Sequence, residues 1–133
     1  MTLTATCHCG ATRITLPEHP TEARRCNCTF CTRTGAVWAY YDPSQLTIKT
    51  EGRDAEYSAS GGMNRHHFCP TCGMQTWGDS PDWAEMYNAD GTPKNGEANA
   101  MPTRRVYQVN LNLVDDLDWS VISIEELDGR ASW

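Results

Sequence analysis

Residues 26–31 read Cys-Asn-Cys-Thr-Phe-Cys and place three thiols close together in the chain. Two more cysteine clusters flank this stretch, Cys-His-Cys-Gly at residues 7–10 and Cys-Pro-Thr-Cys-Gly at residues 69–73. Four thiolates close a tetrahedral zinc site, whereas three leave one coordination position for a substrate or water. The seven cysteines therefore predict one closed, structural zinc site and one open site that can support chemistry.

The composition favours a reduced, metal-binding protein over a disulfide framework. A chain of 133 residues reads as one domain, residues 1–133. Its net charge of −6 argues against a nucleic-acid surface or an anionic membrane surface, both of which need basic residues. No secretory signal and no membrane-length apolar run is visible, so we expect a cytoplasmic protein. In that compartment clustered cysteines bind metal more often than they form disulfides, and an odd number fits disulfides poorly.

Alternating and β-branched residues predict a mainly β fold of short antiparallel strands, with little helix. The first cysteine cluster lies between two such runs, so we expect a hairpin that carries metal ligands at its turn. The predicted strands are residues 2–6, 11–16, 22–26, 36–41, 46–50, 55–60, 64–69, 74–77, 105–113 and 121–127. Residues 79–103 are rich in Pro, Gly, Asn and Asp and predict a long loop that is either a functional cover or mobile.

Glycine divides the three cysteine clusters into two kinds. The first and third clusters end in Cys-Gly, and a glycine with positive φ lets backbone N–H groups approach sulfur. The central cluster ends in Cys31-Thr32 instead. We therefore assign the structural zinc to the first and third clusters, Cys7, Cys9, Cys69 and Cys72. The second zinc, with catalytic potential, is assigned to the central cluster, Cys26, Cys28 and Cys31.

Two alternatives follow from the same residues. A histidine could complete a Cys₃His site on the central cluster, the candidates being His8, His66 and His67. Both zincs would then be structural, and the protein would be a non-enzymatic scaffold whose 79–103 loop binds a partner. If the position stays open, three thiolates leave the zinc site negatively charged, which suits a thiol substrate better than the activation of water.

The cysteine clusters resemble the glutathione-dependent formaldehyde-activating enzyme family, which also contains the centromere protein V-like domains. Cys-x-Cys-Gly at residues 7–10, Cys-x-Cys-x-x-Cys at 26–31 and Phe-Cys-x-x-Cys-Gly at 68–73 carry the resemblance, in this order. Residues 109–111 and 128–130 also look like family positions. The resemblance covers nearly the whole chain.

The resemblance implies a zinc-stapled β-tent fold with the same two sets of zinc ligands. It also implies a carbon–sulfur lyase that adds glutathione sulfur to formaldehyde and gives S-hydroxymethylglutathione, so the expected partner is a small thiol and aldehyde. Residues 79–103 look like an insertion. Asn27 stands where the best-known members often have His, and Arg33 is a candidate for binding a substrate carboxylate. Candidates for lining a pocket are Trp38, Tyr40, His66, Trp77 and Trp83.

Overall fold

The computed structural model describes residues 2–96 and 101–132. In these residues the chain forms ten strands: β1 (Leu3–Thr6), β2 (Arg13–Leu16), β3 (Glu22–Cys26), β4 (Trp38–Tyr41), β5 (Thr47–Lys49), β6 (Ala55–Tyr57), β7 (Arg65–Phe68), β8 (Gln75–Pro81), β9 (Arg105–Asn110) and β10 (Ser123–Leu127). The α-helices of the described residues are α1 (Thr29–Thr34), α2 (Trp83–Met86) and α3 (Gly129–Ser132), and short 3₁₀ turns occupy Pro43–Gln45, Leu111–Leu113 and Trp119–Val121. The predicted mainly β fold is confirmed.

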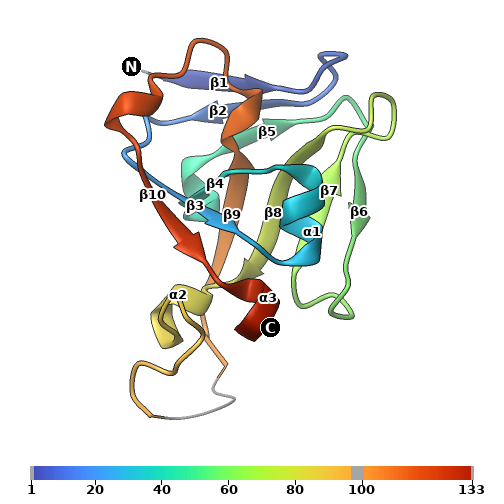
Figure 1. Cartoon of the computed structure of the whole chain (residues 1–133). Coiled ribbons are helices and arrows are strands. Elements are labelled where there is room, and N and C mark those ends of the chain that lie inside the picture. The colour runs from blue at the N-terminus through green and yellow to red at the C-terminus, as the bar shows by residue number, and fades with distance from the viewer. Residues whose placement is uncertain (1, 97–100, 133) are drawn as a thin grey trace.

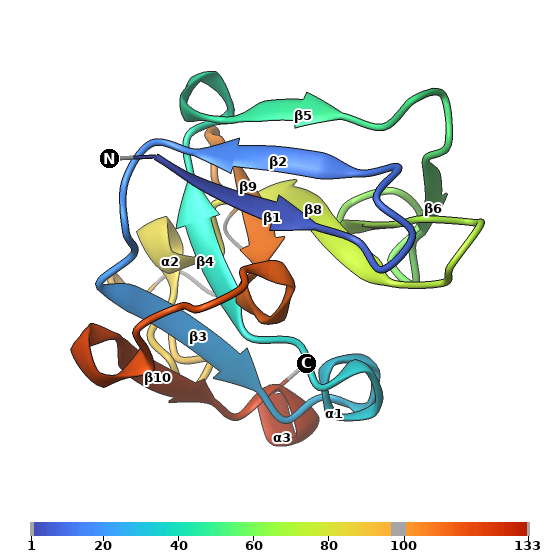
Figure 2. The ribbon, with the colours of Figure 1, turned by 90° about the horizontal axis from the view of Figure 1, so that it is seen from above.

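The strands form two sheets whose directions cross (Figure 1). A three-stranded sheet has the order β1-β2-β5, and a seven-stranded sheet has the order β10-β3-β4-β9-β8-β7-β6. The predicted hairpin is β1 and β2, which pair antiparallel from Leu3↔Leu16 to Thr6↔Arg13. The turn of this hairpin therefore carries the first cysteine cluster, at one end of the small sheet (Figure 2).

One strand departs from the predicted antiparallel pattern. β10 pairs parallel with β3, in register from Ser123↔Glu22 to Leu127↔Cys26. Parallel neighbours need a long crossover between them, and here β4 to β9 lie between the two strands in sequence. β10 therefore brings residues near the C-terminal end beside the central cysteine cluster, and Figures 1 and 2 both show α3 next to α1.

The hydrophobic core lies between the two sheets. Ile14 and Leu16 of the small sheet are fully buried and belong to one cluster with Val109 and Leu111. Burying a Leu or Ile side chain contributes about 1.5–3 kcal/mol. The alternation of β2, which points these two residues inward, thus fixes how the small sheet sits on the large one.

Little helix is present, as predicted, and Gly35, which adopts φ 70°, ends α1. Two sequence-based expectations need correction. The segment 79–103 is not devoid of regular structure, since β8 continues to Pro81 and α2 follows; residues 97–100 lie outside the described residues. The strand predicted at 105–113 ends at Asn110, whose side chain accepts a hydrogen bond from the Asn112 N–H and caps a 3₁₀ turn.

None of the helices in the described parts of the chain has the length and hydrophobicity that crossing a membrane requires.

Candidate metal centre

Four cysteines from two distant turns meet at one point. The four-cysteine group consists of Cys7, Cys9, Cys69 and Cys72, whose sulfur atoms all lie within 4.8 Å of one another. The hairpin turn after β1 supplies the first two, and the turn between β7 and β8 supplies the others. The glycines that follow each pair, Gly10 and Gly73, have φ values of 86° and 78°, as the sequence pattern predicts.

The spacing of these sulfurs fits a tetrahedral zinc ion. The Sγ atoms of Cys7 and Cys9 are 3.7 Å apart, and those of Cys9 and Cys69 are 3.6 Å apart. Zn–S bonds of about 2.3 Å in a tetrahedron place neighbouring sulfurs about 3.8 Å apart. The Thr12 N–H donates to Cys7 Sγ at 3.2 Å. The group therefore matches a structural zinc site in donor type, number and spacing.

The second set of thiols lies at the junction of β3 and α1. The three-cysteine group consists of Cys26, Cys28 and Cys31, again with sulfur atoms within 4.8 Å of one another. Cys28 is the N-cap of α1, and its Sγ accepts a hydrogen bond from the Cys31 N–H at 3.4 Å. The Cys28 N–H donates to Cys26 Sγ, also at 3.4 Å. The backbone of this turn thus orients the sulfurs, as outer hydrogen bonds do around metal ligands.

The close approach of the Cys26 and Cys31 sulfurs shifts the pKa values of the two thiols in opposite directions. A side-chain hydrogen bond from Cys31 is the main influence on Cys26 and helps lower the pKa of that thiol to about 5, against the effect of its burial. The same bond, together with burial, raises the pKa of Cys31. The opposite directions of the two shifts reflect the short distance between these sulfur atoms, a spacing that also suits a shared cation.

The C-terminal segment encloses the three-cysteine group through Asn27. The Asn27 Nδ2 donates to Asp128 Oδ1 at 3.0 Å, and its Oδ1 accepts from the Arg130 N–H at 2.8 Å. Arg130 Nε also donates to the Asn27 carbonyl oxygen at 2.9 Å. Asn27 thus ties the end of β3 to α3, a role that its sequence neighbours do not indicate.

Histidines do not complete the three-cysteine group in the described residues, where neither group includes one. His8 is exposed. The ring of His66 stacks on Phe30, with centroids 3.9 Å apart, and burial lowers the pKa of His66 to about 4. His66 Nδ1 is buried and has no hydrogen-bond partner. The proposed Cys₃His arrangement is therefore not formed, although His66 lies near the group through Phe30.

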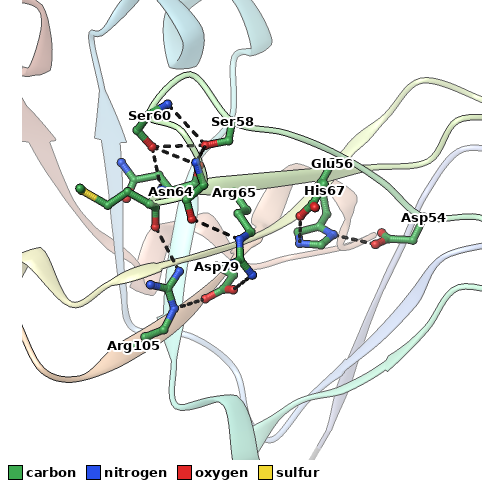
Figure 3. A network of polar contacts seen from close by, with 11 residues as sticks. Asp54, Glu56, Ser58, Ser60, Asn64, Arg65, His67, Asp79 and Arg105 are labelled. Carbon is green, nitrogen blue, oxygen red and sulfur yellow. Dashed lines mark hydrogen bonds and ion pairs between the residues drawn. The ribbon is translucent and has the colours of Figure 1, made fainter.

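His67 belongs to a separate polar network on β6, β7 and β8 (Figure 3). Its Nδ1 lies 2.6 Å from Asp54 Oδ2, and its ring stacks on Trp77 with centroids 3.7 Å apart. In the same view Arg65 and Arg105 both reach Asp79. These contacts fix the edge of the large sheet and direct His67 to carboxylates rather than to cysteine sulfur.

The other predicted site residues lie in different parts of the structure. Arg33 is exposed at the last turn of α1, where its Nη1 donates to the Thr29 carbonyl oxygen at 3.2 Å. Trp38 is 3% exposed and packs in a cluster with Cys26 and Cys31. Tyr40 packs against this cluster and lines a cavity. Trp77 and Trp83 lie elsewhere, Trp83 donating to Asn64 Oδ1 at 2.9 Å. The structure thus gathers only Trp38, Tyr40 and His66 around the three-cysteine group.

Comparison with known proteins gives consistent matches over most of the chain. The model of the family described as "Glutathione-dependent formaldehyde-activating enzyme" matches residues 2–110, which contain all seven cysteines. A Halomonas elongata protein named "Putative glutathione-dependent formaldehyde-activating enzyme" is 28% identical over 138 positions, covering 96% of this chain and 85% of that protein. The crystal structure of a Rhodobacter sphaeroides structural-genomics protein superimposes with a TM-score of 0.63 at 25% identity, covering 93% of this chain and 99% of the other.

Proposed function

This chain belongs to the glutathione-dependent formaldehyde-activating enzyme family, and we propose that it is a zinc-dependent enzyme that makes or breaks a carbon–sulfur bond between a thiol and an aldehyde. The four-cysteine group would hold a structural zinc. The three-cysteine group of Cys26, Cys28 and Cys31 would hold the second, more labile zinc, at which the reaction takes place. Glutathione and formaldehyde are the first substrates to test, because the family is named for them.

The reaction needs no oxidant or reductant. In the direction of addition, a lone pair of the thiol sulfur attacks the carbonyl carbon and the carbon–sulfur bond forms. The π pair of the C=O bond moves to oxygen, and the thiol proton ends on that oxygen. The product is an S-hydroxyalkyl thiol adduct, and the reverse reaction is carbon–sulfur bond cleavage, which is the lyase direction.

The observation that carries this proposal is the difference between the two cysteine groups. In the described residues, the first group offers four sulfurs and the second offers three, with no histidine or carboxylate beside them. A zinc ion on three protein ligands, when bound, supplies a Lewis acid that holds a thiol as thiolate or polarises a carbonyl. A scaffold with two structural zincs would need a fourth donor in the second group.

The chain's own residues prepare the open coordination position of the three-cysteine group in two ways. The backbone N–H groups of Cys28 and Cys31 orient the sulfurs, so the donors are arranged before a substrate arrives. Trp38 covers one side of the group and is almost fully buried, which keeps water from that side and strengthens electrostatic interactions there.

The proposal is tested by the rate of thiol–aldehyde exchange. Glutathione and formaldehyde combine without a catalyst, so the rate is measured by NMR exchange spectroscopy at equilibrium, with and without protein reconstituted with two equivalents of zinc. We expect acceleration by wild type and its loss in Cys28→Ser. The same samples are analysed for zinc and for thermal unfolding, so that a folding defect is distinguished from a catalytic one. Acceleration by a folded Cys28→Ser variant that equals the wild-type value would refute the assignment.

A further inference from the structure

Each sulfur of the three-cysteine group accepts a hydrogen bond from an N–H group, and one of the three donors comes from outside the turn. Cys26 Sγ accepts from the Cys28 N–H, and Cys28 Sγ accepts from the Cys31 N–H, each at 3.4 Å. The sulfur of Cys31 accepts from the Trp38 side chain, whose donor is the indole N–H. Trp38 is the first residue of β4, so this third hydrogen bond joins α1 to the large sheet.

The backbone donors near Cys31 are already in use. The Cys31 N–H donates to Cys28 Sγ. The Thr32 N–H donates to the Cys28 carbonyl oxygen and the Gly35 N–H to the Cys31 carbonyl oxygen, both at 2.9 Å. Free N–H groups occur only in the first turn of a helix, and there the N-cap Cys28 takes one of them. A sulfur inside α1 therefore needs a donor from another element.

The four-cysteine group obtains its N–H donors in a different way. The Thr12 N–H donates to Cys7 Sγ at 3.2 Å, and the backbone of Met74 forms a hydrogen bond with the sulfur of Cys72. Such bonds come from the turns that carry the cysteines, and they do not depend on the identity of a side chain. The bond to Cys31 depends on a tryptophan, which makes Trp38 a feature of the second group alone.

Trp38 is held in place by the sheet and by the side chains around it. Its backbone pairs with Arg24 of β3 and with Asn110 of β9. Its side chain packs in one cluster with two cysteines of the group, and its ring centroid lies 5.9 Å from that of His66. The residue is only 3% exposed. The indole therefore has little freedom to turn its N–H away from the sulfur.

A second indole of the same sheet shows that burial alone does not provide an acceptor. Trp77 Nε1 is buried and has no hydrogen-bond partner. The Trp77 ring stacks on His67, with centroids 3.7 Å apart. The two tryptophans thus differ in whether the indole N–H is bonded, and Trp77 is a matched control for Trp38.

The hydrogen bond alters the charge on sulfur. A side-chain hydrogen bond with Cys26 and burial raise the pKa of Cys31, and the bond from Trp38 opposes this rise. A donor that stabilises a thiolate attracts electron density from it, and the effect is stronger in buried surroundings. Because the indole has a donor and no acceptor, it cannot itself act as a metal ligand.

We propose that the indole N–H of Trp38 is a positioning group of the second metal site, which draws negative charge from the Cys31 sulfur and so keeps zinc on three thiolates able to polarise an aldehyde. The inference rests on the proposed function and deepens it by naming a residue that acts through a metal ligand. Three thiolates outweigh the charge of Zn²⁺ and weaken it as a Lewis acid. A hydrogen bond to one of these sulfurs offsets part of that effect.

The hydrogen bond is tested directly on wild type by NMR, which requires no variant to fold. ¹¹³Cd is bound by thiolates as zinc is, and its nucleus couples to a proton that is hydrogen-bonded to a ligand sulfur. With cadmium in both cysteine groups, we expect coupling between the second cadmium and the Trp38 indole proton, and none to that of Trp77. Two cadmium signals without this coupling would overturn the inference alone. A single signal, from the four-cysteine group, would refute the proposed second metal site and thus the proposed function.

A second test removes the N–H and keeps the ring. Trp38 is replaced by benzothienylalanine, in which a sulfur atom stands in place of the indole N–H, and Trp77 is replaced in the same way in a control variant. Both proteins and wild type are loaded with Co²⁺, whose thiolate charge-transfer bands report the electron density on sulfur. Replacement of Trp38 should move the bands of the three-cysteine group to longer wavelength, because the Cys31 sulfur gains electron density. Replacement of Trp77 should leave all bands unchanged.

Turnover of the zinc-loaded proteins then tests the role in the reaction. The Trp38 variant should accelerate thiol–aldehyde exchange about 10-fold less than wild type, a typical effect of a lost contact to a metal ligand, and the Trp77 variant should equal wild type. Zinc analysis and thermal unfolding of the same samples distinguish this from a loss of metal or fold. Equal spectra of the two variants, or a band shift with unchanged turnover, would overturn the inference. The expected coupling and band shift in a protein without turnover would refute the proposed function and confirm the Trp38 contact.

Discussion

The sulfur atoms of Cys9 and Cys69 lie 3.6 Å apart, although sixty positions separate them in the chain. Cys9 belongs to the hairpin of the small sheet, and Cys69 follows β7 of the large sheet. A metal at this point would therefore join the two sheets at an edge that the hydrophobic core does not reach, because Cys7, Ala11 and Cys69 form a small cluster of their own.

The two cysteine groups should respond differently to mutation. Cys69→Ser removes a ligand of the four-cysteine group, and structural zinc contributes about 10–16 kcal/mol of apparent free energy, so we expect loss of the tightly held zinc and a large fall in the unfolding temperature. Cys28→Ser should release only the labile zinc and leave unfolding nearly unchanged. Metal analysis and thermal unfolding of metal-replete samples check the expected results for both variants. A similar loss of stability in the two variants would contradict separate structural and catalytic roles.

Asn27 should tune metal affinity at the three-cysteine group without contributing a ligand. Asn27→Ala removes the side-chain hydrogen bonds to Asp128 and to the Arg130 N–H, and the loss of such outer contacts weakens metal binding by about 10–100-fold. Competition with a zinc chelator measures this change. The matched control is Gln45→Ala, which removes an amide side-chain hydrogen bond to the Asp42 N–H in the turn that follows β4. Equal zinc affinities of the two variants would show that Asn27 has no such role.

The interface between the sheets should be sensitive to the loss of single side chains. Leu16 is fully buried between them, and a Leu→Ala change in a core costs about 2–5 kcal/mol. Val121→Ala provides the comparison, since Val121 is 52% exposed and should alter stability by less than about 0.5 kcal/mol. Chemical denaturation at constant zinc concentration measures both changes. A small effect of Leu16→Ala would mean that the sheets pack more loosely than the structure indicates.

Asp42 contributes stability that depends on pH. Hydrogen bonds from Ser44, first the hydroxyl and then the N–H, lower the pKa of Asp42 below 3.8. A carboxyl group whose pKa is lower in the folded state stabilises the fold fully above its unfolded pKa, and this contribution is lost as pH falls through the folded value. Ser44→Ala should therefore raise the pKa of Asp42 toward 3.8 and reduce this acid-sensitive contribution.

Carboxyl NMR titration of the Ser44→Ala variant measures the change directly. Asp118 is an internal control in the same spectra, because the hydroxyl and N–H of Ser120 lower its pKa by the same kind of contacts. The Asp118 pKa should stay constant while that of Asp42 rises. Parallel shifts of both carboxyl groups would point to a global change instead of a local hydrogen bond.

Local patterns predicted the positions of the strands, most clearly where alternate residues of a strand are buried. β3 begins at Glu22 and ends at Cys26, as expected, and β2 alternates as its burial requires. The positive φ of Gly10 and Gly73 also followed from the Cys-Gly pairs. These features depend on residues close in sequence, so one sequence is sufficient to find them.

Two kinds of feature could not be predicted, namely a helix built from poor helix formers and the features that depend on distant contacts. α1 is of the first kind, because Cys28 caps its first turn and Gly35 ends its last. Nothing local shows that β10 lies parallel to β3. Arg24 reads as an ordinary strand arginine until Tyr40 and Glu125 are placed beside it. The surroundings of Arg24 are thus a product of topology, whereas the family resemblance pointed to Arg33 as the arginine that binds a carboxylate.

The parallel placement of β10 also orders events during protein synthesis. The ligands of the four-cysteine group are complete once Cys72 has left the ribosome, and chains fold progressively from the N-terminal side. The strand that flanks Cys26 and the Asn27–Arg130 contacts are made from residues that emerge later than Cys72. A nascent chain can thus capture its structural metal early, while the surroundings of the second thiol group assemble only after translation of residue 130. The two cysteine groups thereby reach their final surroundings at different times.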